Sequence, residues 1–403
     1  MRGGRTAVVI LVGLIGLLMI LGIGRNMLRP STRLQGEDDV RLPGDPFGVI
    51  PSQDGRWLFV SISNSAGTSG SVAALKRHAG HIELARVVPV PSEPTGMALT
   101  HDGKLLIVAA HNRVVFLDVP RMTAGAADPV LGSIKEPGIT VGSFYVNVTA
   151  DDKFLFVSEE SAASITVIDL ERARKTGFHE DAILGGIPVG ERPVALTFSP
   201  DNNWLYTTSE EAPPEWGWPA ECAREAGSDP ELVQPQGAVI VVDVDIARRS
   251  PAEAVVARVP AACTPVRAAI SPEGDRLFVT ARKSNAVVVF DTAKLLSDGA
   301  HARLGLVPVG QSPAPMAVID GGTKLLVGNS SRYATPHPPG TLTVLDTAKL
   351  QQGAGAVLGI IPTGSFPREM SVSPDGNTVF LTNSDSGFLQ VIDAKNLPLL
   401  PSH

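Results

Sequence analysis

Hydrophobic and polar residues follow one another along this chain in a short pattern that recurs about every 50 residues. Each copy is a polar turn followed by an apolar run rich in β-branched and aromatic residues, as in "DGNTVFL" at residues 375–381. A turn joined to such a run predicts a β-hairpin. The other copies are "DGRWLFV" at 54–60, "DGKLLIV" at 102–108, "DDKFLFV" at 151–157, "DNNWLYT" at 201–207, "EGDRLFV" at 273–279 and "GGTKLLV" at 321–327.

A proline eight residues before the turn marks the start of each repeat. It is present in six of the seven copies, and Ser143 takes its place in the third. Proline suits the first residue of an inner strand, where its missing N–H breaks no ladder hydrogen bond. Each repeat continues with a third strand, such as residues 165–170, and a fourth, such as 303–310. The marker prolines are Pro46, Pro94, Pro193, Pro265, Pro313 and Pro367.

Seven repeats of this length, each with four strands and no long helix, predict an all-β fold. We expect a seven-bladed β-propeller with four antiparallel strands per blade. The last repeat lacks a clear fourth strand, whereas residues 39–46 resemble a fourth strand without its preceding three. We therefore expect the N-terminal strand to complete the last blade and close the ring, which removes exposed sheet edges.

Composition agrees with short elements and narrows the class of partner. The chain has 403 residues, with 40 glycines and 33 prolines, which favour many tight turns. Its net charge is -7, and its body contains no basic stripe. Nucleic-acid binding relies on clustered Lys and Arg, so we expect no nucleic-acid partner.

The first residues differ from the rest of the chain. Residues 6–24 are apolar and are flanked by arginines on both sides, which predicts an N-terminal apolar helix for export or anchoring. The run is about long enough to cross a bilayer and lacks an A-x-A cleavage pattern, so we favour an uncleaved membrane anchor; secretion after cleavage is the alternative. The expected organisation is a signal-anchor and linker at 1–36 and the propeller at 37–403.

The repeated grammar of "SPDG", a "TN" after the second strand and "VID" at the third resembles the YVTN-repeat propellers, a lactonase-like group of extracytoplasmic proteins. The resemblance covers residues 39–396. It implies the seven-bladed fold. Propellers of this group include lactone hydrolases, partners of redox enzymes and binding proteins, so the resemblance leaves several functions open.

Strand directions place the loops on two faces. Loops that lead into the inner strands, and loops between second and third strands, share what we call the loop-rich face; the Asp-Gly turns share the other. The loop-rich face holds an insertion in blade four, residues 209–237, and a blade-six loop, residues 330–340. Loops on a rigid scaffold usually carry binding. The expected binding residues are Tyr145, Trp216, Trp218, Arg332, Tyr333 and His337.

The two cysteines lie on this same face. Cys222 is inside the blade-four insertion, and Cys263 is in the loop that enters the next inner strand. We expect a disulfide between them, with two unrelated buried thiols as the alternative. A disulfide persists only in an oxidising compartment, so we place the body of the protein outside the cytoplasm, periplasmic or at the cell surface.

The positions after each marker proline suggest a reactive site at the mouth of the axial channel. Most are small or apolar, but blade five has Arg267 and blade seven has Arg368 and Glu369. Guanidinium groups beside a carboxylate could hold a carboxylate, phosphate or carbonyl oxygen, with Glu369 as general base. The alternative is an ion pair between blades.

Histidines add one candidate base and no metal site. His111 follows the second strand of blade two and faces the loop-rich side, so it is the other candidate base. His78 and His81 form an H-x-x-H without a third ligand nearby, and we expect neither a metal nor a cofactor. No nucleophile elbow or phosphate loop is present.

These observations favour a membrane-tethered, extracytoplasmic propeller that binds a protein or a small ligand through its loop-rich face. The alternative, which the family resemblance implies, is a hydrolase of lactones or similar esters. It would act at the mouth of the axial channel, with Glu369 or His111 as base and with Arg267 and Arg368 stabilising the oxyanion.

Overall fold

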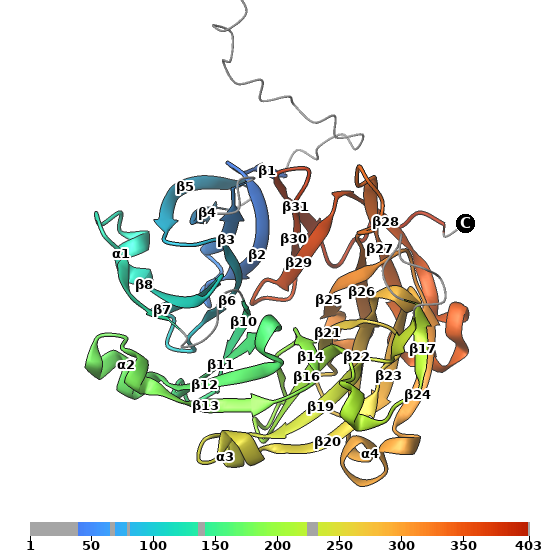
Figure 1. Cartoon of the computed structure of the whole chain (residues 1–403). Helices are drawn as coiled ribbons and strands as arrows, with labels where there is room; N and C mark the ends of the chain where they lie inside the picture. Colours follow the sequence, from blue (N-terminus) through green and yellow to red (C-terminus); the bar gives the residue numbers. More distant parts are fainter. Residues whose placement is uncertain (1–38, 65–68, 79–80, 136–141, 224–232, 402–403) are drawn as a thin grey trace, which may run out of the picture. The chain divides into compact units, whose positions relative to one another are not determined.

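The computed structural model describes residues 39–64, 69–78, 81–135, 142–223 and 233–401. Within these ranges the strands form seven consecutive blades of a β-propeller (Figure 1), so the predicted fold class is confirmed. The predicted signal-anchor and linker, residues 1–36, lies outside the described residues. No helix in the described part is long and apolar enough to span a membrane.

Each of the first three blades is a four-stranded antiparallel sheet with strands in sequence order. Blade one contains β2 Asp45–Pro51, β3 Trp57–Ser63, β4 Gly70–His78 and β5 His81–Val90. Blade two contains β6 Pro94–Leu99, β7 Leu105–Ala110, β8 Arg113–Asp118 and β9 Val130–Lys135. Blade three contains β10 Ser143–Val148, β11 Phe154–Glu159, β12 Ser164–Asp169 and β13 Ile183–Pro188.

The later blades follow the same order, with a divided inner strand in blade four. Blade four contains β14 Glu191–Pro193, β15 Thr197–Phe198, β16 Trp204–Glu211, β19 Ala238–Asp243 and β20 Val255–Pro260. Blade five contains β21 Pro265–Ile270, β22 Arg276–Ala281, β23 Ala286–Asp291 and β24 Arg303–Pro308. Blade six contains β25 Pro313–Ile319, β26 Lys324–Asn329, β27 Pro339–Asp346 and β28 Val357–Ser365.

Blade seven is closed by the N-terminal strand, as the sequence predicted. It contains β29 Pro367–Val372, β30 Thr378–Asn383, β31 Phe388–Asp393 and β1 Val40–Arg41. In β1, Val40 pairs with Leu389 and Arg41 with Phe388, both of β31, in antiparallel register. Figure 1 shows β1, from the start of the chain, beside β31 near its end. The ring is therefore latched by two distant parts of the sequence.

Short helices follow several third strands. An aspartate that ends the strand accepts a hydrogen bond from a backbone N–H two or three residues on, as Asp169 does from Arg172 at 2.8 Å. This is the usual action of an N-cap side chain. The α-helices are α1 Val119–Thr123, α2 Leu170–Thr176, α3 Val244–Ala247 and α4 Thr292–Ser297.

The blade-four insertion is attached to blade five by a disulfide. Its described residues include a two-stranded sheet of β17 Ala220–Ala223 and β18 Val233–Pro235. Cys222 of β17 is bonded to Cys263, in the loop between β20 and β21, with the two Cα atoms 5.6 Å apart. The predicted disulfide is confirmed, and such bonds suggest an oxidising compartment.

Buried hydroxyl groups on second strands join neighbouring blades. Thr280 of β22 is fully buried; its Oγ1 accepts from the N–H of Arg267 at 3.1 Å and donates to the carbonyl of Ala314 in blade six at 3.1 Å. Equivalent hydroxyls in other blades make the same donation to the next blade. They are Ser61 to Thr95, Thr208 to Val266 and Thr382 to Phe47, at 2.6, 3.0 and 2.6 Å.

Two blades lack this hydroxyl and fill its place differently. Blade two has Ala109, and here Thr95 of the inner strand donates to the carbonyl of Phe144 in blade three at 2.9 Å. Blade six has Gly328, where an added Cβ would lie 2.5 Å from Cγ of Pro315. A proline ring thus occupies the space of the missing side chain. Blade two therefore keeps a hydrogen bond to the next blade, and blade six fills the space within its own sheet.

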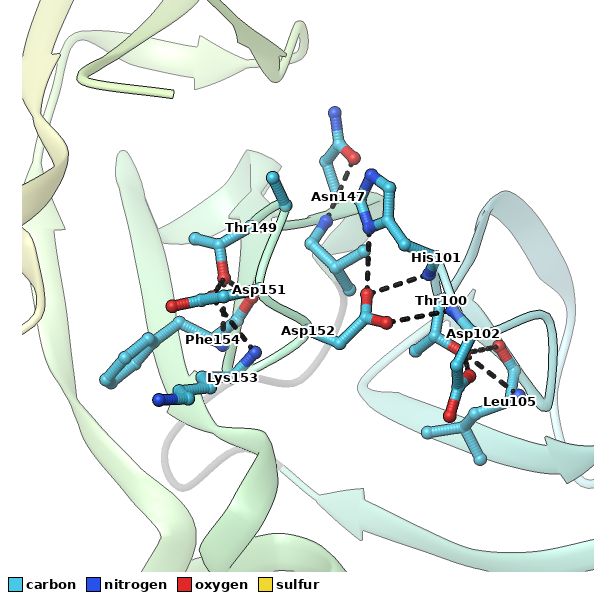
Figure 2. A network of polar contacts seen from close by, with 12 residues as sticks. Thr100, His101, Asp102, Leu105, Asn147, Thr149, Asp151, Asp152, Lys153 and Phe154 are labelled. Atoms are coloured by element: carbon cyan, nitrogen blue, oxygen red, sulfur yellow. Dashed lines mark hydrogen bonds and ion pairs between the residues drawn. The ribbon is translucent and has the colours of Figure 1, made fainter. Parts of the chain in front are cut away.

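The opposite face carries turns that also link blades (Figure 2). In blade two, Thr100 Oγ1 donates to Asp102 Oδ1 at 2.6 Å within the turn. Asp152 of the blade-three turn accepts from the backbone N–H groups of His101 and Asp102 at 2.8 and 3.0 Å. Asp152 has a φ of 54°, a region that aspartate tolerates better than most residues. Asp152 of blade three therefore caps the turn of blade two.

We expect Thr280→Val to lower the free energy of unfolding by about 1–3 kcal/mol, because the N–H of Arg267 and the carbonyl of Ala314 would be left buried without a partner. Thr280→Ser is the matched control, since it keeps the hydroxyl, and its loss should be clearly smaller. Urea unfolding of the full-length protein in detergent measures both. Equal losses for the two variants would assign the effect to packing instead.

Candidate functional site

The loop-rich end of the axis is lined by three tiers of side chains, each drawn from equivalent positions in successive blades. The first tier is the residue after the marker position: Phe47, Thr95, Phe144, Val194, Val266, Ala314 and Arg368. The second is the residue before it: Asp45, Glu93, Gly142, Arg192, Thr264, Ser312 and Phe366. The third lies nine residues after the start of the turn: Ser63, His111, Glu160, Glu210, Arg282, Ser330 and Ser384.

Members of these tiers surround a cavity of about 550 Å³, which we call the central cavity. Its apolar wall consists of Phe47, Phe144 and Phe366. The rings of Phe47 and Phe144 meet edge to face, with centroids 5.4 Å apart. Polar and charged side chains complete the lining. A cavity of this size with an apolar wall and a few charged groups is typical of a small-ligand site.

Arg368 is held in the central cavity by two aromatic rings. Its Cζ lies 4.3 Å from the ring centroid of Phe47 and 4.9 Å from that of Phe366. Among the described residues it has no carboxylate within 4.0 Å. Burial, together with repulsion from Arg332, lowers the pKa of Arg368 to about 9. The guanidinium is therefore fixed in position while its charge is uncompensated.

Arg332 adds a second uncompensated guanidinium, from the blade-six loop. It lines the same cavity, and its pKa is lowered by burial and by the charge of Arg282. Within the described ranges no carboxylate lies within 4.0 Å of it. The loop is held by His337, whose Nδ1 is 2.8 Å from Asp385 Oδ2 and whose Nε2 is 3.0 Å from the carbonyl of Arg332. His337 thus positions Arg332.

Other charges near the cavity are paired with one another. Glu210 receives Arg192 Nε at 3.1 Å on one oxygen and Arg282 Nη1 at 3.2 Å on the other. Arg192 also reaches Glu211, at 3.3 Å. Glu160 lines the cavity next to this network, and its pKa is raised by burial and by repulsion from Glu210. The paired groups form the scaffold of the rim, and Arg332 and Arg368 are left to face the cavity.

Below the first tier, three residues from alternate blades meet across the axis. Tyr145 of blade three donates its hydroxyl to Glu369 Oε2 of blade seven at 2.5 Å and accepts from Nη2 of Arg267 of blade five. Arg267 Nε lies 3.4 Å from Glu369 Oε2. Burial raises the pKa of Tyr145 well above its usual value, so the phenol stays neutral and can donate. We call these residues the axial triad.

The axial triad divides the space along the axis. Tyr145, Arg267 and Glu369 line a lower cavity of about 330 Å³, which shares no lining residue with the central cavity. Arg368 and His111 line the central cavity instead. The four residues considered as catalytic therefore do not meet in one volume. The Arg267–Glu369 contact has the geometry of the ion pair between blades that was the alternative interpretation.

The remaining binding candidates lie elsewhere on the loop-rich face. Trp216 and Trp218 contact each other, with ring centroids 5.1 Å apart, and pack against the apolar core between blades three and four. Arg258 covers Trp216 with its Cζ 5.2 Å from the ring centroid. Tyr333, 36% exposed, lines a separate cavity beside the disulfide. Of the expected binding residues, only Arg332 lines the central cavity.

Sequence reasoning missed several charged residues of the site. Arg192, Glu210 and Arg282 form the ion-pair network, and Glu93 and Glu160 line the cavity. The signal that could have found them is the blade-by-blade comparison, applied to the residue before the marker proline and to the end of the second strand. The first of these positions is charged in blades one, two and four, and the second is charged in blades three, four and five.

Within the described part of the chain, no three or more His, Cys, Asp or Glu side chains are grouped to hold a metal ion. What the central cavity offers is the guanidinium groups of Arg332 and Arg368, the carboxyl groups of Glu93 and Glu160, and aromatic rings. Such a donor set can bind a charged organic molecule by hydrogen bonds and apolar contact.

Comparisons with known proteins support the fold. No protein-family model matches the chain, and no curated protein matches it. Among solved structures, the chain is similar to hydrazine synthase of Kuenenia stuttgartiensis, with 21% sequence identity, a TM-score of 0.63, and coverage of 90% of this chain and 99% of that one. At this identity the likeness shows a propeller fold alone. The YVTN-repeat family is not confirmed by these comparisons.

The tyrosines allow a direct test of the axial packing. The chain contains three, and the pKa of each is raised by burial: Tyr145 strongly, Tyr206 to about 12, and Tyr333. We expect clearly less tyrosinate absorbance from the folded protein at pH 10 than from the protein unfolded in urea, which should be about half ionised there, and any signal from the folded protein should come from Tyr333. Because each pKa is higher in the folded protein than in the unfolded chain, the phenols contribute to the free energy of unfolding below the unfolded-state pKa. This contribution is lost as the pH rises above that value.

Tyr145→Phe is the control for this titration, because a residue that is neutral at pH 10 contributes no signal when it is removed. A folded protein that ionises one tyrosine near pH 10, and loses that signal in Tyr145→Phe, would show that the axial triad is not buried as described.

Proposed function

We propose that the protein is an extracytoplasmic binding propeller that takes a small anionic ligand with an apolar body into its central cavity. The observation that carries this proposal is the pair of unpaired guanidinium groups, Arg332 and Arg368, on the wall of a cavity of about 550 Å³. This narrows the expected partner from a protein or small ligand to a small ligand.

Electrostatics supports an anion. Arg368 is partly buried, whereas Arg332 is exposed at the rim of the cavity. A charge that is partly removed from water and left unpaired destabilises the folded state, and an opposite charge in direct contact relieves this. Arg332 and Arg368 also repel each other, as the lowered pKa of Arg368 reflects. A carboxylate or phosphate held by both would compensate the two charges together. The planar fork of arginine suits such groups.

Preorganisation supports binding of useful strength. The rings of Phe47 and Phe366 fix the guanidinium of Arg368, and the hydrogen bonds of His337 fix the loop that carries Arg332. Side chains that are already ordered lose little entropy when a ligand arrives. The apolar surface of Phe144 then contacts the body of the ligand.

Location and tethering are part of the proposal. The disulfide between Cys222 and Cys263 supports an oxidising compartment. The apolar run at residues 6–24 has the composition of a membrane anchor. We propose that this segment holds the propeller at the outer side of a membrane, where small solutes reach the loop-rich face.

Hydrolysis of a lactone or ester is the second candidate, favoured by the approach of Arg267 to Glu369 at 3.4 Å. Against it, Glu369 already accepts from Tyr145 and faces the lower cavity, whereas His111 and Arg368 line the central cavity. A general base needs a free lone pair within reach of the water it activates. We therefore place binding first.

The test of the binding proposal is Arg368→Met, assayed with hydrocinnamate as a probe that joins a carboxylate to a phenyl ring. In the full-length protein in detergent, saturating probe at about 100 times Kd should stabilise the wild type by about 2.7 kcal/mol, a rise of about 3 °C in Tm. The variant should lose this rise. Without probe, its Tm should be higher than that of the wild type, because an uncompensated buried charge has been removed.

Arg303→Met is the matched control, since Arg303 is exposed on β24 and lies outside the cavity. It should keep the full rise in Tm. If the wild type gave no rise in Tm with any carboxylate probe, the proposal would be wrong.

The hydrolase candidate has its own test, a panel of γ-lactones and phenyl esters. We expect no turnover above the buffer rate for the wild type, because neither candidate base, Glu369 or His111, lines the same cavity as both Arg267 and Arg368. Turnover that is abolished in both Glu369→Gln and Arg267→Met, with folding intact by circular dichroism, would contradict this and place chemistry at the axial triad.

A further inference from the structure

The central cavity also carries carboxyl groups that have no partner. Glu93 of the second tier and Glu160 of the third tier both line it. Among the described residues, neither side chain makes a hydrogen bond or an ion pair. They come from blades two and three, whereas Arg332 and Arg368 come from blades six and seven. Carboxyl and guanidinium groups that lack a direct partner therefore reach one cavity from different blades.

These opposite charges do not neutralise each other. Glu160 and Arg332 are close enough to influence each other electrostatically, yet they are not within the 4.0 Å of an ion pair. Nearby, Arg192, Arg282 and Glu210 do pair directly. A cavity whose walls keep a carboxyl group and a guanidinium apart is complementary to a ligand that carries both charges and spans the gap.

We propose that the ligand of the central cavity is a zwitterion, an amino acid with an apolar side chain. This rests on the proposed anion-binding function and extends it. Its carboxylate is held by Arg332 and Arg368, its ammonium group by Glu160 with Glu93, and its side chain by the phenylalanines. Ammonium and carboxylate groups are recognised by different blades, so a ligand that lacks either group leaves one side of the cavity unpaired.

The aromatic residues favour an apolar side chain over a polar one. Phe47, Phe144 and Phe366 supply the uncharged wall between the two charged sides. A hydrophobic side chain packed there removes apolar surface from water, and a polar one would lose its hydration without a partner. The cavity volume of about 550 Å³ is ample for one such amino acid.

Isothermal titration of the full-length protein with three probes tests this. L-Phenylalanine has both charges, hydrocinnamate lacks the ammonium group, and phenethylamine lacks the carboxylate. We expect phenylalanine to bind at least tenfold more tightly than hydrocinnamate, and phenethylamine to bind most weakly. In Glu160→Gln the preference for phenylalanine should fall to about threefold or less, and the affinity for hydrocinnamate should not fall, because a negative charge near the arginines is removed.

Glu191→Gln is the matched control, because Glu191 is an exposed carboxylate of β14 outside the cavity. It should keep the full preference. Equal affinity of the wild type for phenylalanine and hydrocinnamate would overturn the zwitterion and leave the anion site in place. Binding of neither probe would overturn both proposals. A preference that survives in Glu160→Gln would overturn the assigned role of Glu160.

Discussion

A buried hydroxyl shared between neighbouring inner strands fixes the geometry on which the rest of this structure depends. Thr280 receives the N–H of Arg267, and Thr382 receives that of Glu369, before each donates to the next blade. The backbone that carries the charged residues is thereby held at a set height and distance from the axis. Without this restraint, a ring of seven sheets could tilt, and side chains from alternate blades would not meet reproducibly.

The charged side chains on this rigid ring are of two kinds: some pair with one another, and others have no carboxylate partner among the described residues. The charges of the Arg192–Glu210–Arg282 network pair within that network, and Arg267 pairs with Glu369 within the axial triad. Arg332 and Arg368 are placed by neighbours that do not neutralise them: aromatic rings and the hydrogen bonds of His337. At Arg368, which is partly buried, a charge without a carboxylate partner costs local stability, and the proposed binding function gives a reason for that cost.

The fold could be predicted because the same turn-and-strand pattern occurs seven times in the sequence. The repeat, the marker prolines and the isolated N-terminal strand each have a local physical cause, and the disulfide joins two loops that strand direction already placed on one face.

The site could be predicted only in part. Arg267 and Glu369 stood out as charged residues two positions after the marker proline. Their contact with Tyr145 depends on the width of the ring, which no local pattern encodes. Trp216 and Trp218 were expected to bind a ligand or partner from the blade-four insertion, whereas the insertion packs them against the core between blades three and four.

The axial triad has a consequence for how solutes move. Since the central and lower cavities have no lining residue in common, a molecule that arrives from the loop-rich face meets a floor of Tyr145, Arg267 and Glu369 and leaves by the route it came. Within the described residues, the central cavity therefore has the form of a cup whose floor is the axial triad. If the proposed ligand binds there, we expect its occupancy to follow the concentration on the loop-rich side.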